Sequence, residues 1–268
     1  MRSVVSIAGL LALVCMSFNP LQTGISFSFI AGNKTSAKII HTDNLGNLYI
    51  VTQTNQLYKF NRNGKPLSTL NYSYTGNIAQ IDASNRMEVF VFYRELNKVV
   101  FLDNNLAFRG ELDLSKAGVI QASGIARAYD NNVWVFDMGD LQLKKVSKKG
   151  EIEQMSGNIR QYTSGNTAVS HLYDNSDRVF VVDSINGIMM FDVFAAYIKT
   201  FPLKSHAEVK VLERYFFYYA GGRLNKYNWQ TTQLSTFSLP DTSRLHRLSI
   251  EKERIYLHKP DSILIYGY

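Results

Sequence analysis

Cysteine is almost absent from this sequence of 268 residues, which contains only Cys15. One cysteine cannot form a disulfide within the chain, and it cannot build a site with several thiolate ligands. Charged residues are also few, at 19%, whereas 46% of the residues are hydrophobic, with 16 Tyr and 16 Phe. Because disordered chains combine low hydrophobicity with high charge, this composition excludes that class and predicts a folded protein.

One long apolar run occurs, at residues 4–18, where it follows Arg2 and precedes Pro20. This order is typical of a secretory signal peptide, and the run is short for a membrane span. We therefore expect residues 1–24 to be a signal peptide, cleaved between Pro20 and Ile25, and residues 25–268 to form one exported domain. A buried N-terminal helix is the alternative. Cleavage would remove Cys15 together with the signal peptide. We do not expect a lipid on Cys15, because the residues directly before it are larger than those of a lipid-attachment motif.

The chain is basic, with a formal net charge of +7 that becomes +6 without Arg2. A positive surface favours anionic neighbours such as lipid headgroups, acidic glycans or an acidic protein. No nucleic-acid-binding motif occurs, so we expect no nucleic-acid partner. The densest basic run comprises Lys144, Lys145, Lys148 and Lys149. It flanks a predicted turn, and we interpret it as a solvated hairpin tip.

Helical periodicity is absent after the signal, and a β-strand repeat takes its place. Each unit has a short apolar strand, a turn rich in Asp, Asn or Gly, a strongly β-forming run, and further polar turns and strands. In the clearest unit, Asn63 and Gly64 predict a tight hairpin. The turn aspartates of four units are Asp43, Asp82, Asp130 and Asp174. We interpret them as turn-forming residues, because Asp hydrogen-bonds readily to nearby backbone.

One aromatic residue marks the second strand of each unit, at Tyr49, Phe90, Trp134, Phe180, Phe217 and Tyr256. A repeat near 40 to 45 residues is typical of propeller blades, so six marks predict an all-β, six-bladed β-propeller. The last unit ends after its third strand, whereas residues 25–32 supply an unclaimed strand. Because a propeller must pair that edge, we expect the N-terminal strand to close the last blade against residues 263–266.

The units DNLGNLYIVTQTNQLYKF and DNSDRVFVVDSINGIMMF resemble the NHL-type repeat. Asn55, Asn97 and Asn186 occupy the position of the repeat's Asn, and Asp137 and Asp183 that of the Asp that ends the second strand. The resemblance covers four blades well and implies a propeller. It implies that both Asp residues stabilise their blades, and it does not imply a particular function.

Known catalytic and nucleotide-binding motifs are absent. The innermost strands offer His41, Asp82, His171, Glu213 and His246 for a metal site at the channel. The histidines occur singly, and counting from the turn aspartates predicts that His41 and His171 point to opposite faces. We therefore expect no metal, no cofactor and no catalysis, and a metal-dependent hydrolase or lyase stays as an alternative.

A propeller has two faces. We call the one with the first-to-second and third-to-fourth turns the hairpin face, and the one with the second-to-third loops and the blade connections the connection face. Longer loops, at 71–77, 113–122 and 155–165, belong to the connection face. We expect it to bind the partner through Tyr72, Tyr74, Tyr93, Arg94, Arg160, Tyr162, Arg223 and Arg244, because Tyr and Arg dominate interface hot spots. The rival is an apolar patch on the hairpin face formed by Phe108, Phe194, Tyr197 and Trp229.

These features predict a non-catalytic, exported scaffold that binds a protein. By analogy with periplasmic propellers of similar appearance, we expect an accessory subunit of an outer-membrane assembly or secretion complex. Its partner would be an outer-membrane β-barrel, and the chain would associate with the membrane only through that partner. A sugar- or peptide-binding propeller is the other alternative.

Overall fold

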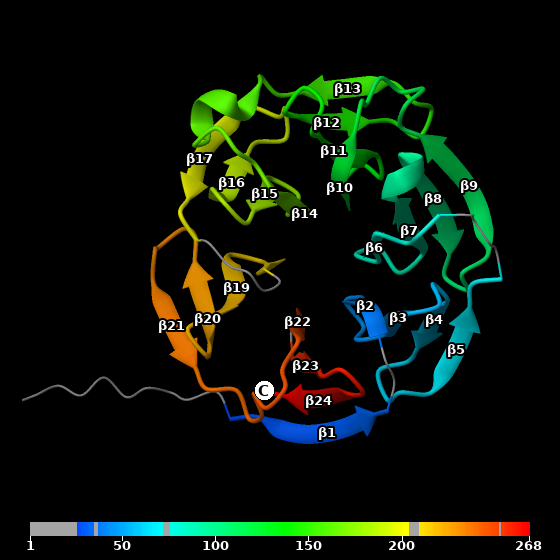
Figure 1. The fold of residues 1–268 in the computed structure, drawn as a ribbon, viewed down its shortest axis with the longest axis vertical. Coiled ribbons are helices and arrows are strands. Elements are labelled where there is room, and N and C mark those ends of the chain that lie inside the picture. The colour runs from blue at the N-terminus through cyan, green and yellow to red at the C-terminus, as the bar shows by residue number, and fades with distance from the viewer. Residues whose placement is uncertain (1–25, 35–36, 72–75, 204–208, 252) are drawn as a thin grey trace, which may run out of the picture.

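The computed structural model describes residues 26–34, 37–71, 76–203, 209–251 and 253–268. They form six four-stranded antiparallel sheets arranged around a central axis (Figure 1). The all-β six-bladed propeller predicted from the repeat is confirmed. No helix among the described residues is long and apolar enough to cross a membrane. The predicted signal peptide lies outside the described residues.

Each blade runs outward from the axis. Blade one consists of β2 (Ala37–Thr42), β3 (Leu48–Thr52), β4 (Leu57–Phe60) and β5 (Pro66–Thr69). Blade two consists of β6 (Gln80–Asp82), β7 (Glu88–Tyr93), β8 (Lys98–Asp103) and β9 (Phe108–Asp113). Blade three consists of β10 (Ala122–Arg127), β11 (Val133–Asp137), β12 (Gln142–Val146) and β13 (Ile152–Met155).

The remaining blades repeat this order. Blade four consists of β14 (Val169–Asp174), β15 (Val179–Asp183), β16 (Gly187–Phe191) and β17 (Tyr197–Phe201). Blade five consists of β18 (Val209–Leu212), β19 (Tyr215–Ala220), β20 (Arg223–Asn228) and β21 (Leu234–Phe237). Blade six consists of β22 (Arg247–Glu251), β23 (Arg254–His258), β24 (Ile263–Gly267) and the N-terminal β1 (Ser28–Asn33).

The ring is closed by β1, which pairs antiparallel with β24 from Ser28 opposite Gly267 to Asn33 opposite Ile263. The predicted closure is confirmed, with the strand beginning three residues after Ile25. Phe29 packs edge-on against Tyr266, with ring centroids 5.5 Å apart. The first strand of the chain therefore completes the last blade and leads directly into the first.

The core lies between neighbouring blades. The second strand of every blade alternates its side chains between two interfaces, as the period of a strand requires. Tyr49 and Val51 pack toward blade two, whereas Leu48 and Ile50 pack toward blade six. Both sets are buried, which explains why the second strands read as continuous apolar runs. All six marker aromatics lie in second strands, as predicted.

Short polar side chains fix the turns and the blade connections. The carboxylate of Asp43 accepts the backbone N–H groups of Leu45 and Asn47 at 2.9 Å, and the other turn aspartates accept the N–H two residues ahead. Asn97 clamps a connection by donating to the carbonyl of Val119 and accepting the N–H of Ala122. Asn55 and Asn186 hold their connections in the same way. The turn-forming role predicted for the aspartates is confirmed.

The basic run of blade three differs from the prediction. Lys144 and Lys145 lie in β12 with side chains 3% and 6% exposed, and only Lys148 and Lys149 are exposed near the hairpin. Lys144 pairs with Asp137 at 2.7 Å, which offsets the cost of burying its charge. The interpretation of all four lysines as a solvated tip is therefore wrong for the first two.

Candidate functional site

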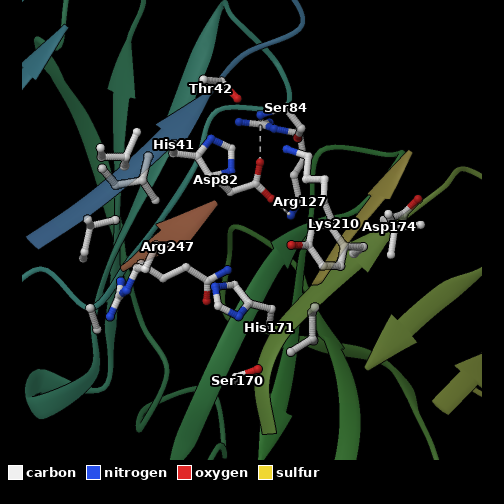
Figure 2. Close-up of a pocket in the computed structure, with 18 of the residues that line it drawn as sticks. His41, Thr42, Asp82, Ser84, Arg127, Ser170, His171, Asp174, Lys210 and Arg247 are labelled. Carbon is white, nitrogen blue, oxygen red and sulfur yellow. Dashed lines mark hydrogen bonds between the residues drawn. The ribbon is translucent and has the colours of Figure 1, made fainter. Parts of the chain in front are cut away.

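A cavity of about 930 Å³ occupies the axis of the propeller. Side chains from all six innermost strands line it: β2, β6, β10, β14, β18 and β22 (Figure 2). These strands run in the same direction, from the connection face to the hairpin face, because each follows a blade connection. A residue's place along its strand therefore gives its height in the cavity.

Strand pairing fixes these heights. The residues opposite the six marker aromatics are His41, Asp82, Ala126, Tyr173, Lys210 and Ser249. We call this the middle level. His171 and Arg247 lie two residues earlier in their strands, so they stand nearer the connection face with side chains on the same side of the sheet.

Both His41 and His171 line the cavity, so the prediction that they point to opposite faces is wrong. The two turn aspartates used for counting are not equivalent positions. Asp174 is the last residue of β14, whereas β2 ends at Thr42 and Asp43 lies one residue beyond the strand. Counting from strand pairs instead of from the turns gives the correct side.

Of the other residues considered for a metal site at the channel, His246 lines the cavity and Glu213 does not. His246 lines the cavity near the connection face. Glu213 lies between β18 and β19 with a positive φ of 51°, and it is not among the cavity-lining residues. Among the described residues, no group of three or more His, Cys, Asp or Glu side chains is arranged to hold a metal ion.

The acidic side chains of the cavity are engaged in structural hydrogen bonds. Asp82, Asp174 and Glu251 accept respectively from the backbone N–H of Arg127 at 2.7 Å, the indole N–H of Trp134 at 2.8 Å and the ammonium group of Lys210 at 2.7 Å. Asp82 lies at the middle level, and the other two lie beyond it toward the hairpin face. Among the described lining residues, the carboxylates therefore lie at the middle level or beyond it toward the hairpin face.

Two arginines stand at the connection-face end instead. Arg94 belongs to the short 3-10 helix η1 (Arg94–Leu96), and an N–H of its guanidinium donates to the carbonyl of Ser123 at 2.7 Å. Arg247 donates to the carbonyl of Lys38 at 3.2 Å and lies beside His171 (Figure 2). Neither arginine forms an ion pair with another described residue.

Burial and these cations keep the cavity histidines neutral. Burial lowers the pKa of His171 to about 4, and the charges of Arg247 and Arg94 act in the same direction. Burial lowers the pKa of His41 to about 3, with Lys210 contributing and Asp82 opposing. Outside the cavity, burial lowers the pKa of His258 to about 3. At neutral pH each ring offers one hydrogen-bond donor and one acceptor.

These histidines should make the protein acid-sensitive. In the unfolded chain histidine titrates near pH 6.5, so below that pH the unfolded state binds protons that the folded state does not. Stability is therefore complete above pH 6.5 and falls toward pH 4, by about 1.4 kcal/mol per pH unit for each buried histidine. In urea unfolding between pH 7 and pH 5, we expect His258→Leu to remove one such slope. Equal slopes in wild type and His258→Leu would contradict this.

The residues predicted to bind a partner are in part where the sequence analysis placed them. All four predicted arginines are exposed on the connection face: Arg94, Arg160 and Arg244 lie in a second-to-third loop or a blade connection, and Arg223 begins β20 directly after such a loop. Arg244 lies 3.5 Å from Asp261, and both side chains are exposed. Tyr72 and Tyr74 lie outside the described residues.

The two remaining tyrosines need correction. Tyr93, at the end of β7, is 2% exposed and packs in the core between blades one and two. The prediction that its side chain lies on the surface is therefore wrong. Tyr162, at the end of the 3-10 helix η2 (Ile159–Tyr162), stacks on Tyr197 with centroids 3.7 Å apart. These two side chains were assigned to rival faces and instead form one contact beside blade four. Trp229 of the rival patch is buried.

Sequence reasoning missed Arg247 and Lys210 as cavity residues. A usable signal exists in blades four and six, where His171 and Arg247 each precede the marker aromatic of their blade by nine residues. Aligning the units on the aromatics instead of on the turn aspartates would have placed both at one height.

The sequence matches no protein-family model and no curated protein. Solved structures of similar fold include a putative exported protein from Bacteroides fragilis, at 14% identity and a TM-score of 0.62, covering 90% of this chain and 95% of that one. They also include BamB from Moraxella catarrhalis, at 10% identity and a TM-score of 0.58, covering 91% and 98%. Virginiamycin B lyase from Staphylococcus aureus is similar at 12% identity and a TM-score of 0.58, covering 91% and 100%. At these identities the likeness concerns the propeller fold alone, and the number of blades follows from the six sheets of this chain.

Proposed function

We propose that this protein is a non-catalytic, exported scaffold that binds an acidic protein surface through its connection face. The observation that carries the proposal is the set of exposed arginines on that face: Arg94, Arg160, Arg223 and Arg244. Only Arg244 has a carboxylate within ion-pairing distance among the described residues, and that pair is exposed and therefore weak. Arginine side chains of this kind are available to a partner, and Arg is enriched in interface hot spots.

The state of the cavity acids supports a non-catalytic role. A catalytic carboxylate must reach substrate, whereas Asp82, Asp174 and Glu251 are already held by protein donors. The fold supplies no contrary argument, because solved propellers of this shape include BamB and a lyase.

The proposed setting is an outer-membrane assembly or secretion complex with a β-barrel partner. Its support is the signal-like N-terminus and the fold shared with the putative exported protein from Bacteroides fragilis. We further propose that the repeats are of NHL type. The support is that Asn55, Asn97 and Asn186, which match the Asn of that repeat, each hydrogen-bond to the backbone of a blade connection; Asn55 and Asn97 hold the connection to the next blade, and Asn186 holds the connection from the preceding one.

A pair of arginine substitutions tests the binding face. Tagged wild-type protein purified from native envelopes should retain an outer-membrane barrel, identified by mass spectrometry. The double variant Arg160→Ala, Arg223→Ala should weaken that association by about 2 kcal/mol or more, roughly 30-fold, because it removes two hot-spot candidates. We exclude Tyr162 from the variant because its stacking on Tyr197 would mix a packing effect with a binding effect.

The matched control removes the same charge from the other face. Arg62 and Arg86 are exposed in hairpin-face turns, so Arg62→Ala, Arg86→Ala lowers the net charge equally. An equal loss in both double variants would show that net charge alone matters and would refute the assigned face. Loss only in the control would place the partner on the hairpin face.

A further inference from the structure

The chain contains two asparagines that are followed directly by glycine, Asn63 before Gly64 and Asn186 before Gly187. Asn63 lies in the turn between β4 and β5, on the hairpin face of blade one, and Asn186 lies in the second-to-third loop of blade four, on the connection face. An Asn-Gly pair is chemically reactive, because glycine has no Cβ to shield its backbone nitrogen from the side-chain amide before it. The two pairs therefore share one chemistry and differ in their surroundings.

Four hydrogen bonds hold the side-chain amide of Asn186. Its oxygen accepts the backbone N–H of Ser164 at 3.0 Å and the hydroxyl of the same residue at 2.9 Å. Its nitrogen donates to the carbonyl of Asn166 at 2.7 Å and to the carboxylate of Asp183 at 2.9 Å. Attack by the nitrogen of Gly187 would make the amide carbon tetrahedral and expel the amide nitrogen, so it has to break hydrogen bonds of this set.

The turn around Asn63 is built by a different side chain. The amide oxygen of Asn61 accepts the backbone N–H groups of Asn63 and Lys65, both at 2.9 Å, and the Asn61 carbonyl accepts the N–H of Gly64 at 2.9 Å. Asn63 itself is exposed, and its side chain makes no hydrogen bond to another described residue. Only the N–H bond of Gly64 has to open before attack, and exposed turn tips open readily.

We propose that Asn63 is a site of spontaneous deamidation and that the fold protects Asn186 from the same reaction. The backbone nitrogen of Gly64 loses its proton and bonds to the amide carbon of Asn63, while the amide nitrogen leaves as ammonia, and a cyclic imide forms. Water then opens the imide at either of its carbonyl carbons, which gives aspartate or isoaspartate. A neutral amide becomes a carboxylate, so each event lowers the net charge of the protein.

The reaction changes a turn that contacts the neighbouring blade. The carbonyl of Arg62, directly before Asn63, accepts a hydrogen bond from the guanidinium of Arg254 in blade six. Isoaspartate lengthens the backbone of the turn beside this contact, because the chain then runs through the side-chain carbons. The modification therefore acts at the boundary between blades one and six. It lies on the hairpin face and does not depend on the scaffold function.

Peptide mapping of the whole protein by mass spectrometry tests the proposal. The protein is incubated in mildly alkaline buffer and, in parallel, in urea that unfolds it. In buffer, Asn63 should deamidate at least about tenfold faster than Asn186, because each net hydrogen bond that must break slows a reaction about 2- to 10-fold. In urea, the two sites should convert at comparable rates, since each is followed by glycine. Equal rates in buffer, or no conversion of Asn63 while the unfolded chain converts, would overturn the proposal.

Substitutions assign the signal to the two sites. Asn63→Gln keeps an amide at the turn but would need a larger ring, so the first acidic form on ion exchange and the isoaspartate detected by enzymatic methylation should disappear. Persistence of both signals in Asn63→Gln would overturn the site. Ser164→Ala removes the hydroxyl that donates to the Asn186 amide, and it should speed conversion of Asn186 while leaving Asn63 unchanged. An unchanged rate at Asn186 would refute protection by these hydrogen bonds.

Discussion

Deletion of β1, residues 28–33, should lower the free energy of unfolding by about 3 to 6 kcal/mol. Five residue pairs join β1 to β24, and a net hydrogen bond contributes about 0.5 to 1.5 kcal/mol. The deletion also leaves the buried side chains of Ile263 and Ile265 at an open edge and removes the covalent tie between blades six and one. Urea unfolding measures the loss.

The physical source of this loss differs from the one suggested by the sequence. A strand so rich in Phe and Ile reads as a buried one, whose side chains stabilise by burial. In the structure β1 is the outermost strand, with Phe29 62% and Ile30 41% exposed. Backbone pairing and ring closure therefore dominate, and Phe29→Ser alone should cost far less than the deletion.

A synthetic peptide provides the control. Residues 26–34 added in trans should restore part of the lost stability, because the open edge of β24 can accept a strand. The same peptide with proline in place of Ala31 should not, since proline removes a ladder N–H. An unchanged unfolding curve after deletion would refute closure by β1.

The architecture was accessible from sequence because the same physical problem recurs six times. Each second strand is buried on both sides, so its marker aromatic appears at a regular spacing, as Trp134 and Phe180 illustrate. The missing fourth strand of blade six is also a sequence signal, because an unpaired edge must be covered. Repetition averages out the uncertainty of any one strand.

The candidate site was less accessible because it is built by departures from the repeat. His171 and Arg247 share a height only through strand pairing, which turn lengths obscure. Arg94 enters from a loop, and its position depends on the carbonyl of Ser123 in the next blade. Tyr93 shows the converse, since a residue next to a loop can still end in the core.

The burial of Lys144 in blade three also could not be predicted from composition. Asp137 is fully buried and accepts the N–H groups of Ile120, Gln121 and Gly139 as well as the ammonium group of Lys144. Burial alone would raise the pKa of Asp137, but these hydrogen bonds outweigh it and lower the pKa. The carboxylate therefore fastens the connection from blade two to the second-to-third loop of blade three, as predicted for an Asp at this position. Asp183 holds the equivalent place in blade four with three backbone N–H donors and the side-chain amide of Asn186, and Met189 stands where blade three has Lys144.

Replacing Lys144 by Met should lower the free energy of unfolding by about 3 kcal/mol. Removing one partner of a buried ion pair costs about 3 to 5 kcal/mol, because the remaining charge is buried without compensation. We use the lower end, since blade four shows that neutral donors, three backbone N–H groups and the side-chain amide of Asn186, can hold the carboxylate without a lysine. A lowered pKa stabilises the fold above the carboxyl's unfolded pKa, and this stability is lost as the pH falls through the folded value. Lys144→Met should raise the folded pKa of Asp137, so acid unfolding should begin at a higher pH.

Lys149→Met, five residues away and exposed, is the matched control and should change stability by less than about 0.5 kcal/mol. Equal losses in the two variants would mean that the buried pair contributes no more than an exposed lysine, and urea unfolding at pH 7 distinguishes the cases.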